Sequence, residues 1–179
     1  MTVIKKMNKI KIIWINLVVL VGLDQIFKYL AIQYLKGQES VSWLGGFLTL
    51  VYAENTGAFL GFGGNWGREI RIFFFVMIVI LGLGSLIWYL LKNEVSKLNL
   101  YAYSFILAGG AGNLIDRIFR KNGAVVDFLL FDTGKTLDLS IIQIPLRTGV
   151  VNSADVVIVA GVVLAFANEY YSRKIILSR

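Results

Sequence analysis

Long apolar runs, separated by shorter polar stretches, dominate the chain. Four of them are long enough to cross a bilayer, which takes about 20 mostly apolar residues. They cover residues 10–32, 70–91, 98–119 and 150–170. The pattern predicts an all-α membrane protein with a single domain, residues 1–179, in which four transmembrane helices form a bundle. The outer loops would be residues 33–69 and 120–149.

Both outer loops contain shorter patterns typical of strands. Residues 41–44 and 47–52 read as two short strands around a Gly45-Gly46 turn. Residues 124–131 and 139–144 could add further strands. Asp132 and Asp138 flank Gly134, and we interpret them as solvated loop carboxylates.

Composition strengthens the membrane interpretation. Apolar residues make up 57% of the chain and charged residues 16%, against roughly 25% charged in soluble domains. Mean hydropathy is +0.72. The net charge of +7 comes largely from basic residues that flank the apolar runs, without interleaved stacking aromatics. These residues indicate membrane anchoring and argue against nucleic-acid binding.

The distribution of basic residues predicts the orientation. The N-terminal lysines, the 92–97 loop and the Arg173-Lys174 tail are expected on the cytoplasmic side. With four spans, both termini would lie inside and both large loops outside. The second loop still carries four basic residues, so the rule is followed only in part. No small-x-small cleavage site follows the first run, so we expect an uncleaved first span.

Histidine and cysteine are both absent. Their absence excludes zinc sites of the usual kind, thiol nucleophiles and histidine-based triads. Acid–base chemistry would therefore need carboxylates, lysine or tyrosine. We expect no metal and no cofactor.

Ionisable residues inside apolar runs are costly and need a reason. Asp24 and Lys28 are four residues apart, hence on one helical face. They could form a salt bridge whose lysine snorkels outward, or they could hold a site. Asn113 and Arg117 share a face on the third run with Asp116 alongside. That polar group could cap the helix or form one wall of a site.

Two further carboxylates are candidates for chemistry. Asp127 lies in an apolar stretch, where a solvated surface position is hard to explain. Asp155 lies where the fourth run begins, and helix starts favour aspartate for structural reasons. Asn152 or Ser153 would make a good N-cap there. A catalytic pair and a purely structural Asp155 both remain open from spacing alone. By itself, the Asn55-Thr56-Gly57 segment reads as a turn.

Five short motifs occur in one order along the chain. They are Asp24-Gln25-x-x-Lys28, Asn55-Thr56-Gly57-Ala58, Gly112-Asn113-Leu114-Ile115-Asp116-Arg117, Val125-Val126-Asp127-Phe128 and Asn152-x-Ala154-Asp155. Together they make the chain resemble the lipoprotein signal peptidases (signal peptidase II) over nearly its whole length. That family consists of aspartic endopeptidases of the bacterial inner membrane, built as four-helix bundles with a small outer β-sheet cradle.

The resemblance implies a function and a site. The enzyme would remove signal peptides from prolipoproteins, cutting before a cysteine that carries diacylglycerol. The prolipoprotein and membrane lipid would be its partners, and we expect a monomer. Asp127 and Asp155 would be the catalytic dyad. From their positions we expect Asp155 to be the more readily ionised, because a helix start lowers the pKa of Asp155 and the apolar run around Asp127 raises the pKa of Asp127. The residues expected to line or support the site are Asn55, Gly57, Asn113, Arg117 and Asn152, with Asp24, Lys28 and Gly109 as weaker carry-overs.

The chain departs from the family pattern in the outer loops. Phe59-Leu60 stands where the family usually has Ala-Phe, Val151 replaces the usual Phe, and residues 132–146 include extra length. These changes bear on substrate preference. They leave a divergent, non-catalytic paralogue that binds lipid or lipoprotein as the main alternative. A small transporter using Asp24 and Lys28 is a second alternative, which the absence of evident repeated halves disfavours.

Overall fold

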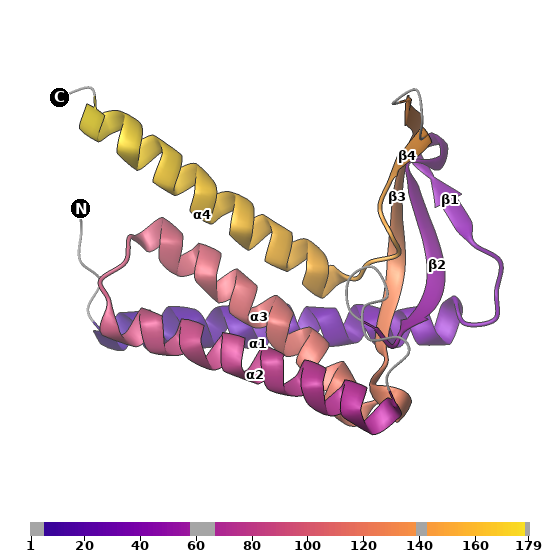
Figure 1. Cartoon of the computed structure of the whole chain (residues 1–179), viewed down its shortest axis with the longest axis horizontal. Helices are drawn as coiled ribbons and strands as arrows, with labels where there is room; N and C mark the ends of the chain where they lie inside the picture. The colour runs from indigo at the N-terminus through magenta and orange to yellow at the C-terminus, as the bar shows by residue number, and fades with distance from the viewer. Residues whose placement is uncertain (1–5, 58–66, 139–142, 178–179) are drawn as a thin grey trace.

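The structure is a computed structural model that describes residues 6–57, 67–138 and 143–177. Long helices and one antiparallel sheet make up this part of the chain (Figure 1). The helices are α1 (Lys6–Tyr34), α2 (Arg68–Lys92), α3 (Lys97–Phe119) and α4 (Ser153–Leu177). All four predicted apolar runs are therefore helical, and the boundaries agree to within four residues, except that α4 continues seven residues beyond the predicted end, to Leu177.

Three of these helices are long and apolar enough to cross a membrane. They are the segments Asn8–Tyr34, Ile72–Lys92 and Ser153–Ser172, and few of their side chains are buried within the protein. Helix α3 is long enough but more polar. It packs against α1, α2 and α4, and its buried face carries Ser104, Gly109, Gly112 and Asp116. A helix surrounded by other helices needs less apolar surface than one that faces lipid, which explains its weaker hydropathy.

The sheet lies across one end of the helices, while both chain termini lie at the other end (Figure 1). Its strands are β1 (Val41–Trp43), β2 (Leu48–Asn55), β3 (Val125–Asp138) and β4 (Gln143–Arg147). They pair in the order β1-β2-β3-β4, and each neighbouring pair is antiparallel. Strands are thus confirmed in both loops. The part of the expected last strand at residues 139–142 lies outside the described residues.

Strand β3 is longer than the sequence predicts. It continues from residue 131 to Asp138, and its pairing with β4 is irregular between Asp132 and Thr136. Gly134 adopts a φ of 66° there, and its N–H donates to the Asp132 carboxylate at 2.8 Å. A glycine in this conformation lets a strand pass through a bulge and resume. The interpretation of Asp132 and Asp138 as loop residues is therefore wrong: both belong to a strand.

A small apolar cluster fixes the sheet on the bundle. Ala31 near the end of α1 packs with Val126 and Phe128 of β3, and all three side chains are buried. Burial of apolar surface stabilises this contact at roughly 25 cal/mol per Å² removed from water. The sheet is therefore held against the end of α1, and β3 has a defined position relative to the helices.

Candidate active site

The start of α4 is tied directly to β3. Val151 bridges to Leu129: its N–H donates to the Leu129 carbonyl at 2.8 Å, and its carbonyl accepts from the Leu129 N–H at 2.8 Å. Because of this pairing, α4 begins at Ser153, three residues later than predicted. The pairing also brings the face of β3 that carries Asp127 to the N-terminus of α4.

Asn152, the residue between that bridge and α4, binds both candidate carboxylates. Its side-chain amide donates to Asp127 Oδ1 at 2.7 Å, and its backbone N–H donates to Asp155 Oδ2 at 3.1 Å. Its amide oxygen accepts from the Asp155 N–H at 3.0 Å, so it also caps the helix. The N-cap prediction for Asn152 is thus confirmed, and the two aspartates meet at one buried residue.

Asn113 of α3 completes the link between the helices. Its amide nitrogen donates to Asp155 Oδ1 at 2.8 Å, while its oxygen accepts from Asn152 and from Lys28 Nζ, both at 3.0 Å. Those two donors fix the orientation of the amide. Asn113 therefore presents an N–H to Asp155 and links α3 to the first turn of α4.

Asp127 lies on β3 opposite Ala53 of β2 and is buried. Burial raises the pKa of its carboxyl to about 6, because the ionised form loses its hydration. Hydrogen bonds from Asn152 and Asn55 lower that pKa again in part, and the nearby Asp155 charge raises it. The expectation that apolar surroundings favour protonated Asp127 is confirmed.

The turn after β2 approaches the same region. Asn55 accepts a hydrogen bond from the Gly57 N–H at 3.1 Å, as expected for a turn. Arg117 donates to the Gly57 carbonyl at 2.8 Å and to the Gly123 carbonyl at 3.3 Å, and its guanidinium lies over the Phe75 ring. Arg117 thus holds the Asn55–Gly57 turn against α3. The continuation of that motif at residues 58–61 lies outside the described residues.

The Asp24–Lys28 pair is buried within the bundle. Lys28 is fully buried and forms ion pairs with Asp24 at 2.9 Å and with Asp116 of α3 at 3.0 Å. The snorkelling interpretation is therefore wrong, because the ammonium points at α3 instead of the interface. Asp116 also accepts from Arg120 Nε at 2.8 Å.

Asp24 caps α4 from the neighbouring helix. Its Oδ1 accepts from the Ser153 hydroxyl at 2.6 Å and from the Ala154 N–H at 2.9 Å. A carboxylate is favourable at a helix N-terminus, where the first N–H groups lack partners within the helix. Asp24 thus supports the start of α4. Lys28 supports Asn113, which in turn donates to Asp155, one of the two candidate catalytic carboxylates.

Gly109 contributes by close packing. A Cβ at this position would collide with the Ala154 carbonyl oxygen and with Ile158 of α4. Gly112, three residues on, leaves room for the Asp24 carboxylate in the same way. The small residues of α3 therefore allow α4 to approach closely, as expected for helices in a membrane.

Three residues belong to this network although the sequence did not predict their part in it. Asp116, which the sequence places in a polar group beside Asn113 and Arg117, binds Lys28, Arg120 and the Val126 N–H. Gln25 donates to Asp116 and to the Gly112 carbonyl, both at 3.3 Å. Ser153 bonds to Asp24. The buried charge of Lys28 was the available signal, because an ammonium in a membrane span needs carboxylate partners from other helices.

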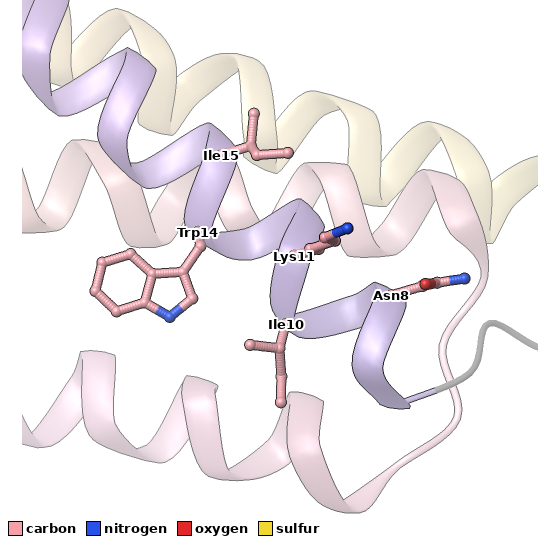
Figure 2. A pocket seen from close by; sticks show the side chains of 5 residues that line it. All are labelled: Asn8, Ile10, Lys11, Trp14 and Ile15. Carbon is pink, nitrogen blue, oxygen red and sulfur yellow. The ribbon is translucent and has the colours of Figure 1, made fainter.

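No group of three or more acidic, histidine or cysteine side chains arranged to hold a metal occurs among the described residues. A shallow depression of about 390 Å³ lies near the N-terminus of α1, lined by Asn8, Ile10, Lys11, Trp14 and Ile15 (Figure 2). These residues lie at the opposite end of α1 from Asp24. The depression is therefore separate from the two carboxylates.

The fold resembles solved bacterial membrane enzymes. One, described as a bacterial membrane enzyme solved by the in meso method at 2.3 Å resolution, superposes with a TM-score of 0.72 and 26% identity over 93% of this chain and 89% of its own. A second, solved at 1.9 Å by the same method, gives a TM-score of 0.69 and 28% identity over 90% and 91%. The helix bundle with its sheet is thus the architecture of a membrane enzyme.

Residues 16–171 match the family model described as signal peptidase (SPase) II. The chain belongs to the signal peptidase II family. The lipoprotein signal peptidase of Borreliella afzelii is 31% identical over 90% of this chain and 91% of its own length. That of Borrelia hermsii is 40% identical over 62% of this chain. The latter match spans 65% of the Borrelia hermsii protein, slightly less than two thirds.

Proposed function

We propose that the chain is an aspartic endopeptidase that removes signal peptides from diacylglyceryl-modified prolipoproteins, cutting before the lipidated cysteine. The observation that carries the proposal is the meeting of Asp127 and Asp155 at Asn152. Family membership supports the peptidase class and its lipoprotein substrates. The aspartic mechanism rests on the geometry of the two carboxylates.

In the proposed reaction, Asp127 holds a proton and Asp155 is ionised. Asp155 takes a proton from water, whose oxygen attacks the scissile carbonyl carbon, while Asp127 donates a hydrogen bond to the carbonyl oxygen. The tetrahedral intermediate then loses its C–N bond, and the leaving nitrogen takes a proton from the dyad. The paired carboxylates activate the water themselves, so the reaction requires no metal or cofactor.

The surroundings support this division of roles. Asn113 and the Asn152 backbone both donate to Asp155, and it lies in the first turn of α4, where the helix dipole favours negative charge. Asp127 is the more buried of the two, which favours its protonated form. The two roles describe the favoured position of one proton shared by the two carboxylates.

We further propose that all four helices span the inner membrane, with both termini in the cytoplasm. Helix α3 is 23 residues long, about 35 Å, which is enough to cross the hydrocarbon core. It packs against the other three helices. The chain termini lie at one end of the bundle and the sheet at the other (Figure 1). The site then lies near the outer face, where acyl chains stay in lipid and the peptide bond meets water. The protein acts as a monomer and binds no nucleic acid.

The test is cleavage of a diacylglyceryl-modified prolipoprotein by the purified full-length chain. Asp127→Asn and Asp155→Asn are compared with Asp132→Asn, a control at a half-buried position further along β3. We expect the wild type and the control to cut before the modified cysteine, and both dyad variants to lose at least about 100-fold in rate, as for a lost acid–base group. A folded wild type that leaves the substrate intact would reject the proposal.

One observation favours the non-catalytic alternative. Asp155 and Asn152 form a reciprocal pair of hydrogen bonds that caps α4, a structural role that needs no chemistry. If Asp155 only caps the helix, Asp155→Asn retains cleavage or lowers it in proportion to lost folded protein. Thermal unfolding of each variant beside the cleavage assay separates the two roles.

A further inference from the structure

A pocket of about 450 Å³ lies on the opposite face of the sheet from Asp127. It is bounded by the end of α1, by β2 and β3, and by the turn η3 (Lys121–Gly123) after α3. Val126 of β3 and Glu54 of β2 are paired and line it. Because successive side chains on a strand point to opposite faces, Asp127 faces away from this pocket. The pocket is therefore distinct from the proposed active site.

The pocket contains one neutralised ion pair. Glu54 accepts from the Tyr52 hydroxyl at 2.6 Å and from Lys36 Nζ at 3.0 Å. These hydrogen bonds, that of Tyr52 above all, hold the pKa of Glu54 below its usual range. The carboxylate is thus ionised at neutral pH, and Lys36 balances its charge.

Two other cationic side chains line the pocket and have N–H groups that are not used in hydrogen bonds within the described part of the chain. Arg120 uses its Nε to bind the buried Asp116 at 2.8 Å. Within the described part of the chain, its two terminal nitrogens and the Lys121 ammonium have no hydrogen-bond partner. Arginine and lysine in this state are suited to bind phosphate oxygens.

The charges around the pocket leave one positive charge in excess. The cations that line it are Lys36, Arg120 and Lys121. Lys36 binds Glu54 and Arg120 binds Asp116, whereas Lys121 binds no carboxylate among the described residues. Two carboxylates therefore balance two of the three cations. One negative charge in the pocket would complete the balance, and a phosphodiester carries one negative charge.

The pocket lies where the spans end. The apolar segment of α1 ends at Tyr34, two residues before Lys36. Ile32 of α1 and Phe119, the last residue of α3, form an apolar wall, and Phe119 is 79% exposed. An apolar wall at the end of a span with cations just beyond it matches the amphipathic character of a phospholipid at the membrane interface.

We propose that this pocket binds the phosphodiester headgroup of an anionic membrane phospholipid. Arg120 and Lys121 donate to the phosphate oxygens, and the acyl chains lie along Ile32 and Phe119. The lipid would hold the sheet at the membrane surface, next to the ends of α1 and α3, which carry the buried residues Lys28 and Asp116. The proposal is independent of peptidase activity.

The test is native mass spectrometry of the purified full-length chain in an uncharged detergent, with dioleoyl phosphatidylglycerol as the probe. Lys121→Gln is compared with Lys135→Gln, which removes an equal charge from the exposed part of β3. We expect Lys121→Gln to weaken lipid binding about fivefold, the effect of one basic residue near a membrane surface. Lys135→Gln is expected to bind like the wild type.

Other arms identify the ligand. Dioleoylglycerol, which lacks the phosphate, is expected to bind at least fivefold more weakly. Equal binding by dioleoylglycerol, or equal loss in both lysine variants, overturns the proposal. Displacement of the lipid by inorganic phosphate at the lipid's own concentration overturns the lipid assignment in favour of a free anion. The Asp127→Asn variant should bind the lipid normally, so a failed cleavage assay leaves this result unaffected.

Discussion

The side-chain amide of Asn152 donates to Asp127 at 2.7 Å, and that contact joins a strand of the sheet to the first residue before a helix. The same residue donates its backbone N–H to Asp155. Asn152 therefore does two separable things: it caps α4, and it holds the two carboxylates at one point.

Substitution can separate these two roles. Asn152→Ser keeps a good capping side chain but is too short to reach Asp127, whereas Asn152→Ala loses both functions. We expect both variants to lose activity, and only the alanine variant to lose about 1 kcal/mol of further stability from the missing cap. Cleavage rates and thermal unfolding in detergent check this. If serine restores the cleavage rate, Asn152 acts through the helix cap alone.

The buried Asp127 predicts a link between pH and stability. Its pKa rises from 3.8 to about 6 on folding, so the unfolded chain gives up this proton at lower pH than the folded one. Stability therefore falls as pH rises from about 4 to 6, by up to about 3 kcal/mol from this group. Asp127→Asn should unfold at a higher temperature than the wild type at pH 7, and the difference should shrink toward pH 4. A constant difference across that range would contradict a raised pKa.

The buried charges around Lys28 predict a large effect of one substitution. Lys28→Met leaves Asp24 and Asp116 buried without their shared cation, which should cost about 3–5 kcal/mol. Lys36→Met removes an exposed pair with Glu54 and should cost about 1 kcal/mol or less. Urea or thermal unfolding in detergent compares them. Adding Asp24→Asn to Lys28→Met should recover part of the loss, and no recovery would argue against charge imbalance as its cause.

The packing of α3 on α4 predicts sensitivity at one glycine. Gly109→Ala places a Cβ against the Ala154 carbonyl and Ile158, so α4 must shift, and with it Asp155. We expect lower stability and lower activity. Gly82→Ala on α2 meets nothing within 4 Å and should be neutral, or stabilising by up to about 1 kcal/mol through helix propensity. If the two variants behave alike in unfolding and cleavage assays, close helix approach is not what Gly109 provides.

Hydropathy was sufficient to predict the helices, because a run of apolar residues long enough to cross the bilayer has few stable structures other than a helix. The residues at which helices and strands begin and end were harder to predict. Helix α4 begins three residues late because Val151 pairs with Leu129, a contact between residues far apart in the chain. Strand β3 continues past Gly134 because a bulge forms there, and a glycine in sequence equally suggests a turn.

The candidate site was predictable as a set of residues but not as an arrangement. Motif order brought Asp127, Asp155, Asn113 and Asn152 together, and the structure links them by hydrogen bonds. Asp24 was expected to support the site, but its capping of α4 was not predictable, because its partners at the start of α4 lie about 130 residues away. Local spacing reveals that a buried charge needs partners, but only the packing of three helices decides which ones.

The capping of α4 by Asp24 also bears on the order of assembly. Asp24 and Lys28 enter the membrane first, in α1, and the i,i+4 spacing lets each neutralise the other during insertion. Asp116 arrives later with α3, and the Ser153 hydroxyl and the Ala154 N–H arrive last, with α4. During synthesis, an inserted bundle of three helices still has an Asp24 oxygen without these donors. Docking of α4 supplies both donors, so the hydrogen bonds around Asp24 are complete only once the last helix is in place.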